Sequence, residues 1–148
     1  MTNKEYINAY KQTQFSSESV TSSYEIVRIL MKELINSMQK IVLDIQDEKL
    51  ETRKNAIVDK LLQDKKTQNK SKNLSKALSI IYGLQTSLDF DKALEISNNL
   101  FQLYEYCRQE IIKGFSQKIE DGIIKAIDII KQIMEGWEEI PSFERKDG

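Results

Sequence analysis

The segment from Ser23 to Ile45, SYEIVRILMKELINSMQKIVLDI, decides the fold. Its apolar residues recur at steps of three and four, namely Val27, Leu30, Leu34, Met38, Ile41 and Ile45. This spacing places them on one face of an α-helix. Ile26, Ile35 and Val42 widen that face, so we expect the helix to contact more than one neighbouring helix. Ser22 or Ser23 is suited to cap its N-terminus, because a serine hydroxyl accepts a hydrogen bond from a free backbone amide there.

Three further segments carry the same periodicity. We predict a first helix over 24–46, which can extend further along the chain, and later helices over 73–89, 91–114 and 116–137. Gly114 is placed to end the third helix, Ser116 to begin the fourth, and Gly136 with Pro141 to end it. Asp89 or Asp91 is a candidate N-cap for the third helix. Because strand-like alternation is missing, the sequence predicts an all-α, antiparallel four-helix bundle forming a single domain over 1–148.

Three segments lie outside these helices. Residues 1–20 are expected to form a flexible N-terminal arm with aromatic anchors, and 138–148 a tail. Residues 47–72 form a long basic insert, in which Lys49 to Lys72 contains eight basic and three acidic residues. We interpret the tract Lys65–Lys72 as a solvated connection, although the insert can also extend the first helix or form a helical spur. No aromatic residue interleaves with these lysines, so we expect no nucleic-acid partner.

The composition excludes many kinds of active site. The 148 residues include no His and one Cys, and the net charge is −1. Without His there is no Ser-His-Asp or Cys-His nucleophile and no imidazole metal ligand. Cys107 falls on an apolar helix face and is expected to be a core residue, and no glycine-rich phosphate loop is found. We therefore expect no enzyme activity, no cofactor and no metal.

The same composition bears on location. A single Cys fits a reducing compartment, so we expect a cytoplasmic protein. No apolar stretch approaches the length of a membrane span, so we expect no membrane insertion.

Apolar and aromatic residues exceed what one buried face of each helix needs. The third predicted helix carries them nearly all the way round, at Leu100, Phe101, Leu103, Tyr104 and Tyr106. Two interpretations stay open. In one, the surplus residues pack against the arm or the insert. In the other, they line a groove for an amphipathic or extended partner segment, with the arm as a removable lid.

Several short motifs, in order along the chain, carry a family resemblance. They are Ala9-Tyr10, Thr21-Ser22-Ser23 with Glu25, Ser87-Leu88-Asp89, Leu103-Tyr104-Glu105-Tyr106-Cys107-Arg108, and the run from Ile130 to Trp137 followed by Glu138. From about Ala9 to Trp137 the chain resembles the FliS family of flagellar export chaperones. It departs from the family where Ser23-Tyr24 replaces Ser-Pro and where Lys32-Glu33-Leu34 replaces Tyr-Asp-Gly.

The resemblance implies a cytosolic chaperone that binds the C-terminal segment of flagellin in a hydrophobic groove. Binding would prevent premature polymerisation and deliver flagellin for secretion. Flagellar regulatory and export-gate proteins are further candidate partners, and we expect a monomer when free. The candidate partner-binding residues are Tyr10 in the arm and Leu84, Leu88, Phe101 and Tyr104 in the groove wall. The alternative is a self-associating helical adaptor or scaffold without an export role, which an obligate dimer would favour.

Overall fold

The computed structural model describes residues 23–54 and 60–139, and for 51–54 and 60–64 it describes the backbone alone. Four helices account for most of this part of the chain: α2 (Ser23–Lys54), α3 (Lys60–Thr86), α4 (Leu94–Gln117) and α5 (Asp121–Glu138). No strand occurs within the described ranges. The prediction of an all-α fold is confirmed.

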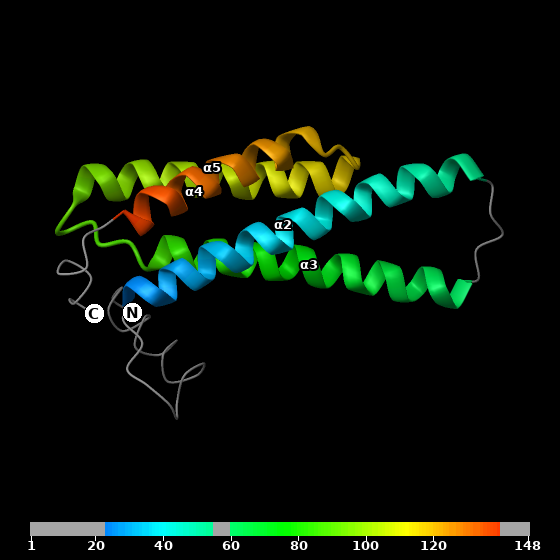
Figure 1. Ribbon diagram of the computed structural model, residues 1–148, viewed down its shortest axis with the longest axis horizontal. Coiled ribbons are helices and arrows are strands. Elements are labelled where there is room, and N and C mark those ends of the chain that lie inside the picture. Colours follow the sequence, from blue (N-terminus) through cyan, green and yellow to red (C-terminus); the bar gives the residue numbers. More distant parts are fainter. Residues whose placement is uncertain (1–22, 55–59, 140–148) are drawn as a thin grey trace, which may run out of the picture.

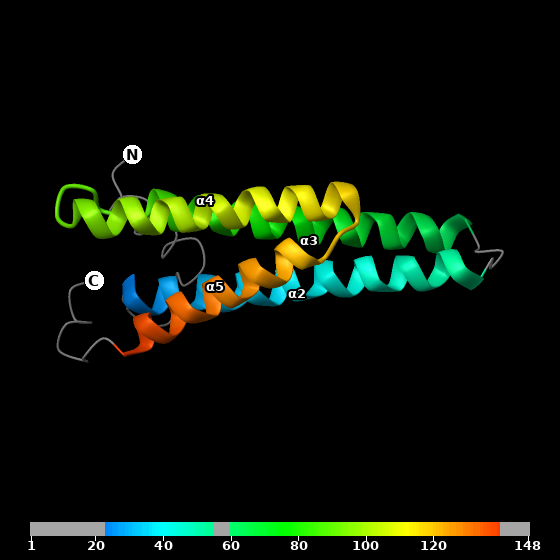
Figure 2. The ribbon, with the colours of Figure 1, turned by 90° about the horizontal axis from the view of Figure 1, so that it is seen from above.

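The helices form two layers. Figures 1 and 2 show α2 and α3 running side by side as a long antiparallel hairpin. Helix α4 follows the line of α3, whereas α5 crosses from the end of α4 toward the start of α2. Accordingly, α2 packs chiefly against α3 and α5, and α4 packs against α5 and α3. This is the four-helix bundle that the sequence predicts.

The core is built around α2. All six residues of its predicted stripe are buried, together with Ile26, Ile35 and Val42. From the other helices the core receives Ala77, Ile80, Ile81, Leu84, Tyr104, Cys107, Ile111, Ile123, Ala126, Ile127 and Ile130. Full burial of one large aliphatic side chain contributes about 1.5–3 kcal/mol, so α2 supplies a large share of the driving force for folding. The width of its apolar face is explained by the two helices that it contacts.

The tract Lys65–Lys72 is largely exposed, as predicted, but the prediction that it is a connection is wrong, because it is part of helix α3. Helix α2 continues to Lys54 and α3 already begins at Lys60, so the insert predicted over 47–72 is helical wherever the structure describes it. No Gly or Pro interrupts the chain between Gln46 and Tyr82, and its Lys, Gln and Glu residues favour helix. Contacts between α2 and α3 stabilise this helical conformation further. Lys70 pairs with Glu48, and Asn73 Nδ2 lies 3.4 Å from Asp44 Oδ2.

The helix ends also differ from the prediction. Helix α4 passes through Gly114 to Gln117, and Lys118 adopts the left-handed conformation (φ 58°, ψ 44°) with its N–H donating to the Gly114 carbonyl. Helix α5 starts at Asp121 rather than at position 116, and Gly136 lies inside it. Pro141 is outside the described residues.

Asp89 orders a turn instead of capping a helix directly. Its Oδ1 accepts hydrogen bonds from the N–H groups of Asp91 and Lys92, at 3.0 and 3.1 Å. Helix α4 itself begins after Ala93, which offers no side-chain cap. The predicted caps at Asp89 and Asp91 are therefore wrong for α4, because its N-cap position falls on Ala93.

Gly114 allows the chain to reverse tightly between α4 and α5. A Cβ atom built at this position would lie 2.6 Å from both the Ile119 carbonyl oxygen and Ile123 Cδ1. Since real Cβ atoms do not approach so closely, a side chain here would push the backbone of the connection outward. The packing position of α5 thus depends on Gly114.

We predict that Gly114→Ala lowers the free energy of unfolding by about 1–3 kcal/mol, the range for overpacking a tight core site. The matched control is Gly136→Ala, because nothing lies within 4 Å of a Cβ at Gly136. That change should stabilise the protein by up to about 1 kcal/mol through helix propensity. Urea denaturation measures both. A Gly114 variant as stable as the unchanged protein would contradict the close approach.

Candidate functional site

Exposed large apolar side chains gather on α4 and the connection before it. Their exposed fractions are 37% for Phe90, 61% for Leu94, 64% for Ile96, 38% for Leu103 and 39% for Tyr106. We call these five residues the α4 apolar surface. Among the described residues, eleven large apolar side chains are exposed, and six of them lie on α4 or this connection, the sixth being Ile112 toward the other end of α4. Such a concentration on one segment is typical of a surface that binds another molecule.

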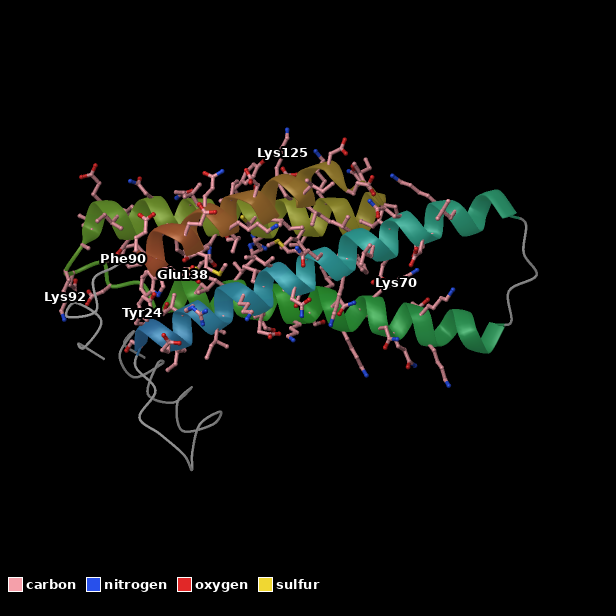
Figure 3. The ribbon with its side chains drawn as sticks, in the orientation of Figure 1. Tyr24, Lys70, Phe90, Lys92, Lys125 and Glu138 are labelled. Carbon is pink, nitrogen blue, oxygen red and sulfur yellow. The ribbon has the colours of Figure 1, made fainter. Side chains whose placement is uncertain are left out.

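The α3–α4 connection is folded onto the first turns of α4. The rings of Phe90 and Phe101 meet edge to face, with centroids 6.2 Å apart and an interplanar angle of 61°. The buried Ser97 donates its hydroxyl to the Asp89 carbonyl at 2.9 Å. Because these two contacts hold the connection against α4, Phe90 has a defined place at the end of the bundle (Figure 3).

A polar link holds α3 and α4 together beside this surface. Gln85 Nε2 donates to the Phe101 carbonyl at 3.4 Å and to Glu105 Oε2 at 3.1 Å. Glu105 also pairs with Arg108 one turn further along α4. Hydrogen bonds from Arg108 and Gln85 lower the pKa of Glu105 to about 2. The carboxylate is therefore charged at neutral pH and keeps Gln85 oriented toward α4.

The structure places the predicted groove residues at two depths. Leu84 and Tyr104 are core residues with exposed fractions of 1% and 2%. Leu88 and Phe101 are half-buried and lie at the end of the bundle where α3 passes into α4. Tyr10 lies outside the described residues. A partner that contacts the bundle as it stands therefore meets Leu88 and Phe101, whereas Leu84 and Tyr104 lie inside it.

Cys107 is a core residue, as the sequence predicts. Its thiol is fully buried, and burial raises its pKa to about 12. Its sulfur lies 3.8 Å from the Ala126 carbonyl oxygen, on the side of α4 that faces α5. A thiol with so high a pKa stays protonated and unreactive at neutral pH.

Leu94 and Ile96 are functional candidates that the sequence analysis did not single out. The signal that one of them is exposed was present in their spacing. Two residues two positions apart in an α-helix point about 200° apart, so they cannot both face one core. Leu94 lies on the side of Phe101, seven residues later, and Ile96 lies on the side of Leu103, also seven residues later. The apolar surface therefore wraps around two sides of α4.

Tyr24 and Trp137 fix the end of α5 to the start of α2. Their rings stack with centroids 5.5 Å apart and an interplanar angle of 9°. Trp137 Nε1 donates to the Tyr24 carbonyl at 3.1 Å, and Arg28 Nε donates to Glu138 at 3.2 Å. Figure 3 shows Tyr24, Glu138 and Phe90 at the same end of the bundle. The point at which the preceding segment joins α2 therefore lies at the end that carries Phe90.

Within 23–54 and 60–139, no group of three or more His, Cys, Asp or Glu side chains is arranged to hold a metal ion. None of the helices described there is long and apolar enough to cross a membrane.

These features define an all-α bundle with exposed apolar side chains on α4 and on the connection before it. A family model for the flagellar protein FliS matches residues 3–144 of the chain. The chain therefore belongs to the FliS family. The name that its relatives carry, flagellar secretion chaperone, denotes a non-enzymatic kind of protein.

Three curated relatives are similar to the chain, and each is named flagellar secretion chaperone FliS. The protein of Vibrio cholerae serotype O1 is 29% identical over 136 residues, which cover 91% of this chain and 88% of the relative. That of Escherichia coli K12 is 30% identical over 53% of the chain and 58% of the relative. That of Salmonella typhimurium LT2 is 33% identical over 48% and 53%. No solved structure matches the chain.

We predict a pH-dependent effect of Glu105→Gln. The pKa of Glu105 in the folded protein is about 2, against an ordinary value of 4.5. A carboxylate with a lowered pKa stabilises the fold above its ordinary pKa, and this stability is lost as the pH falls through the folded value. Because the pair lies at the surface, we expect the variant to lose less than about 1 kcal/mol at pH 6.

That loss should shrink as the pH falls from about 6 toward about 2. Urea titrations across this range measure it, with Glu135→Gln on α5 as the control for removing an exposed carboxylate. A loss from Glu105→Gln that is independent of pH would contradict the assigned role.

Proposed function

We propose that this protein binds the C-terminal segment of flagellin and holds it until secretion. The observation that carries the proposal is the α4 apolar surface, found in a member of a flagellar secretion chaperone family. A segment that is disordered when free can fold its apolar side chains onto this surface. Holding flagellin in this way hides the residues through which it would polymerise too early.

The binding energy would come from burial. Each large apolar side chain that passes from water into an interface contributes up to about 1.5–3 kcal/mol. Part of this is offset by the entropy lost when the bound segment becomes ordered, so affinity depends on several side chains acting together. Ile96 and Leu94 have the most to gain, because more than half of each side chain is exposed.

The predicted groove residues take two roles in this proposal. Leu88 and Phe101 are half-buried and would contact the bound segment at the edge of the α4 apolar surface. Leu84 and Tyr104 lie in the core. We propose that they reach the segment only where α3 and α4 move apart, and otherwise support the surface from within.

We also propose that the N-terminal arm covers the surface in the free protein through Tyr10. Tyr10 stands 13 residues before Ser23. An extended chain of that length spans up to about 45 Å, which exceeds the roughly 36 Å length of α4. Since Ser23 lies at the end of the bundle that carries Phe90, the arm is long enough to place Tyr10 on the α4 apolar surface.

We predict that Leu94→Ser weakens binding of the flagellin C-terminal segment about tenfold, or about 1.4 kcal/mol. Leu94 is 61% exposed, so the change removes contact area without disturbing the core. Isothermal titration calorimetry with the segment from the same organism measures the effect. The matched control is Ile124→Ser on α5, which is 47% exposed and lies outside the α4 apolar surface.

Equal losses from Leu94→Ser and Ile124→Ser would contradict the location of the site. An obligate dimer that ignores the flagellin segment would contradict the function itself and favour the self-associating adaptor.

We predict that Tyr10→Ala strengthens binding of the same segment, because an arm that occupies the surface lowers the fraction of protein able to bind. The same calorimetric titration gives the affinity. Phe15→Ala in the same arm serves as a control for loss of an aromatic ring. An affinity unchanged by Tyr10→Ala would contradict the lid.

A further inference from the structure

A cavity of about 180 Å³ opens where the end of α4 meets the α2–α3 hairpin. Ile41 and Ile45 of α2 and Phe115 of α4 form its apolar wall. Lys70 of α3 and Lys118, just past the end of α4, line it together with Glu48. This is the opposite end of α4 from Phe90 and Leu94, so the cavity is separate from the α4 apolar surface.

The charged side of the cavity holds two lysines, Lys70 and Lys118, and two carboxylates, Asp44 and Glu48, and both lysines pair with Glu48. Lys118 Nζ lies 2.6 Å from Glu48 Oε2, and Lys70 pairs with the other oxygen of the same carboxylate. Burial alone would raise the pKa of Glu48, but the hydrogen bonds from Lys118 and Lys70 outweigh it and lower the pKa. Asp44, also in the lining, is engaged by the amide of Asn73 at 3.4 Å. Each lysine thus shares its carboxylate and has donors left for another.

The hairpin continues past this cavity on its own. Beyond Glu48, α2 runs six more residues to Lys54, and before Lys70, α3 has ten residues from Lys60. At 1.5 Å per residue this is an extension of about 9–15 Å. Figures 1 and 2 show it projecting beyond the α4–α5 connection, where neither α4 nor α5 covers it. The layer that α4 and α5 provide elsewhere is therefore missing from this side of the hairpin.

The charge on α3 indicates what kind of partner would cover this side of the hairpin. Helix α3 contains six basic residues and one acidic residue, although the whole chain has a net charge of −1. Between Lys65 and Leu88 there is no acidic residue at all. Such a helix attracts an acidic partner and repels a second copy of itself, because two copies of α3 would bring like charges together.

We propose that the cavity and the adjoining side of the hairpin bind an acidic segment of another protein. One large apolar side chain of that segment enters the cavity, and its carboxylates pair with Lys70 and Lys118. The volume suits this anchor, since an apolar cavity of about 150 Å³ accepts benzene, the size of a phenylalanine ring. An apolar anchor in a pocket surrounded by charge pairs is the arrangement that concentrates binding energy at interfaces.

The test uses three synthetic helical peptides of equal length and the full chain. The first carries glutamates around a central phenylalanine, the second replaces the phenylalanine with serine, and the third replaces the glutamates with lysines. Calorimetry or fluorescence anisotropy gives the affinities. We expect saturable one-to-one binding of the first peptide, at least tenfold weaker binding of the second, and no binding of the third.

Protein variants locate the site. Lys70→Gln with Lys118→Gln should weaken binding of the first peptide at least tenfold. The matched control is Lys125→Gln with Lys131→Gln on α5, which removes the same charge from exposed positions away from the cavity and from α3. Thr67→Trp is a second variant. Thr67 lines the cavity but is exposed, so a large side chain there should fill the cavity, abolish binding and leave the fold intact.

Four results would overturn the proposal. The first two are no saturable binding of the acidic phenylalanine peptide and equal binding of the serine peptide. The third is an equal loss from the two pairs of lysine substitutions. The fourth is dimerisation that Thr67→Trp abolishes, because a second copy of the chain would then be the occupant. Tighter binding of a single-stranded oligonucleotide than of the acidic peptide would likewise assign the lysines to phosphate. Flagellin binding at the α4 apolar surface is independent of each result.

Discussion

Burial of the wide apolar face of α2 is the interaction on which the rest of the structure depends. The face contacts α3 on one side and α5 on the other, so both helix layers meet on it. At one end, the stack of Tyr24 on Trp137 extends this packing to the last turn of α5. At the other end, the chain must reverse within the few residues after Gln117, and Gly114 provides the space for that reversal. With α2 removed, α3 and α5 would each lose the helix against which they pack most extensively.

The bundle leaves two surfaces incomplete at opposite ends of α4, and their chemistry differs. At the α4 N-terminus, the exposed side chains are apolar and include Leu94 and Ile96. At its C-terminus, a small cavity is lined in part by Lys70 and Lys118, beside the end of the α2–α3 hairpin that extends beyond α4. An apolar surface selects for side chains that avoid water, whereas a basic one selects for charge. The two proposed partners would therefore bind at separate sites without competing.

The sequence predicted most of the fold and part of the site. The recurrence of Leu30, Leu34 and Met38 indicated a buried helix face, and every such residue is in the core. The helical insert was missed because the polar tract Lys65–Lys72 has no apolar period, and its helix is held instead by pairs to α2 such as Lys70 with Glu48. Lys70 and Glu48 are 22 positions apart, so no local pattern in the sequence reveals their pairing. The same holds for the link from Gln85 to Glu105.

What the sequence by itself determined is the class of fold, the absence of imidazole chemistry and the family, because periodicity, composition and motif order are properties of the chain. The tertiary structure alone decided which of the surplus apolar residues are core and which are exposed. Tyr104 and Tyr106 look alike in sequence, yet one is 2% and the other 39% exposed. The reason is physical: a helix apolar on several sides buries those that meet a neighbour, and the angle at which α5 crosses sets where that neighbour lies.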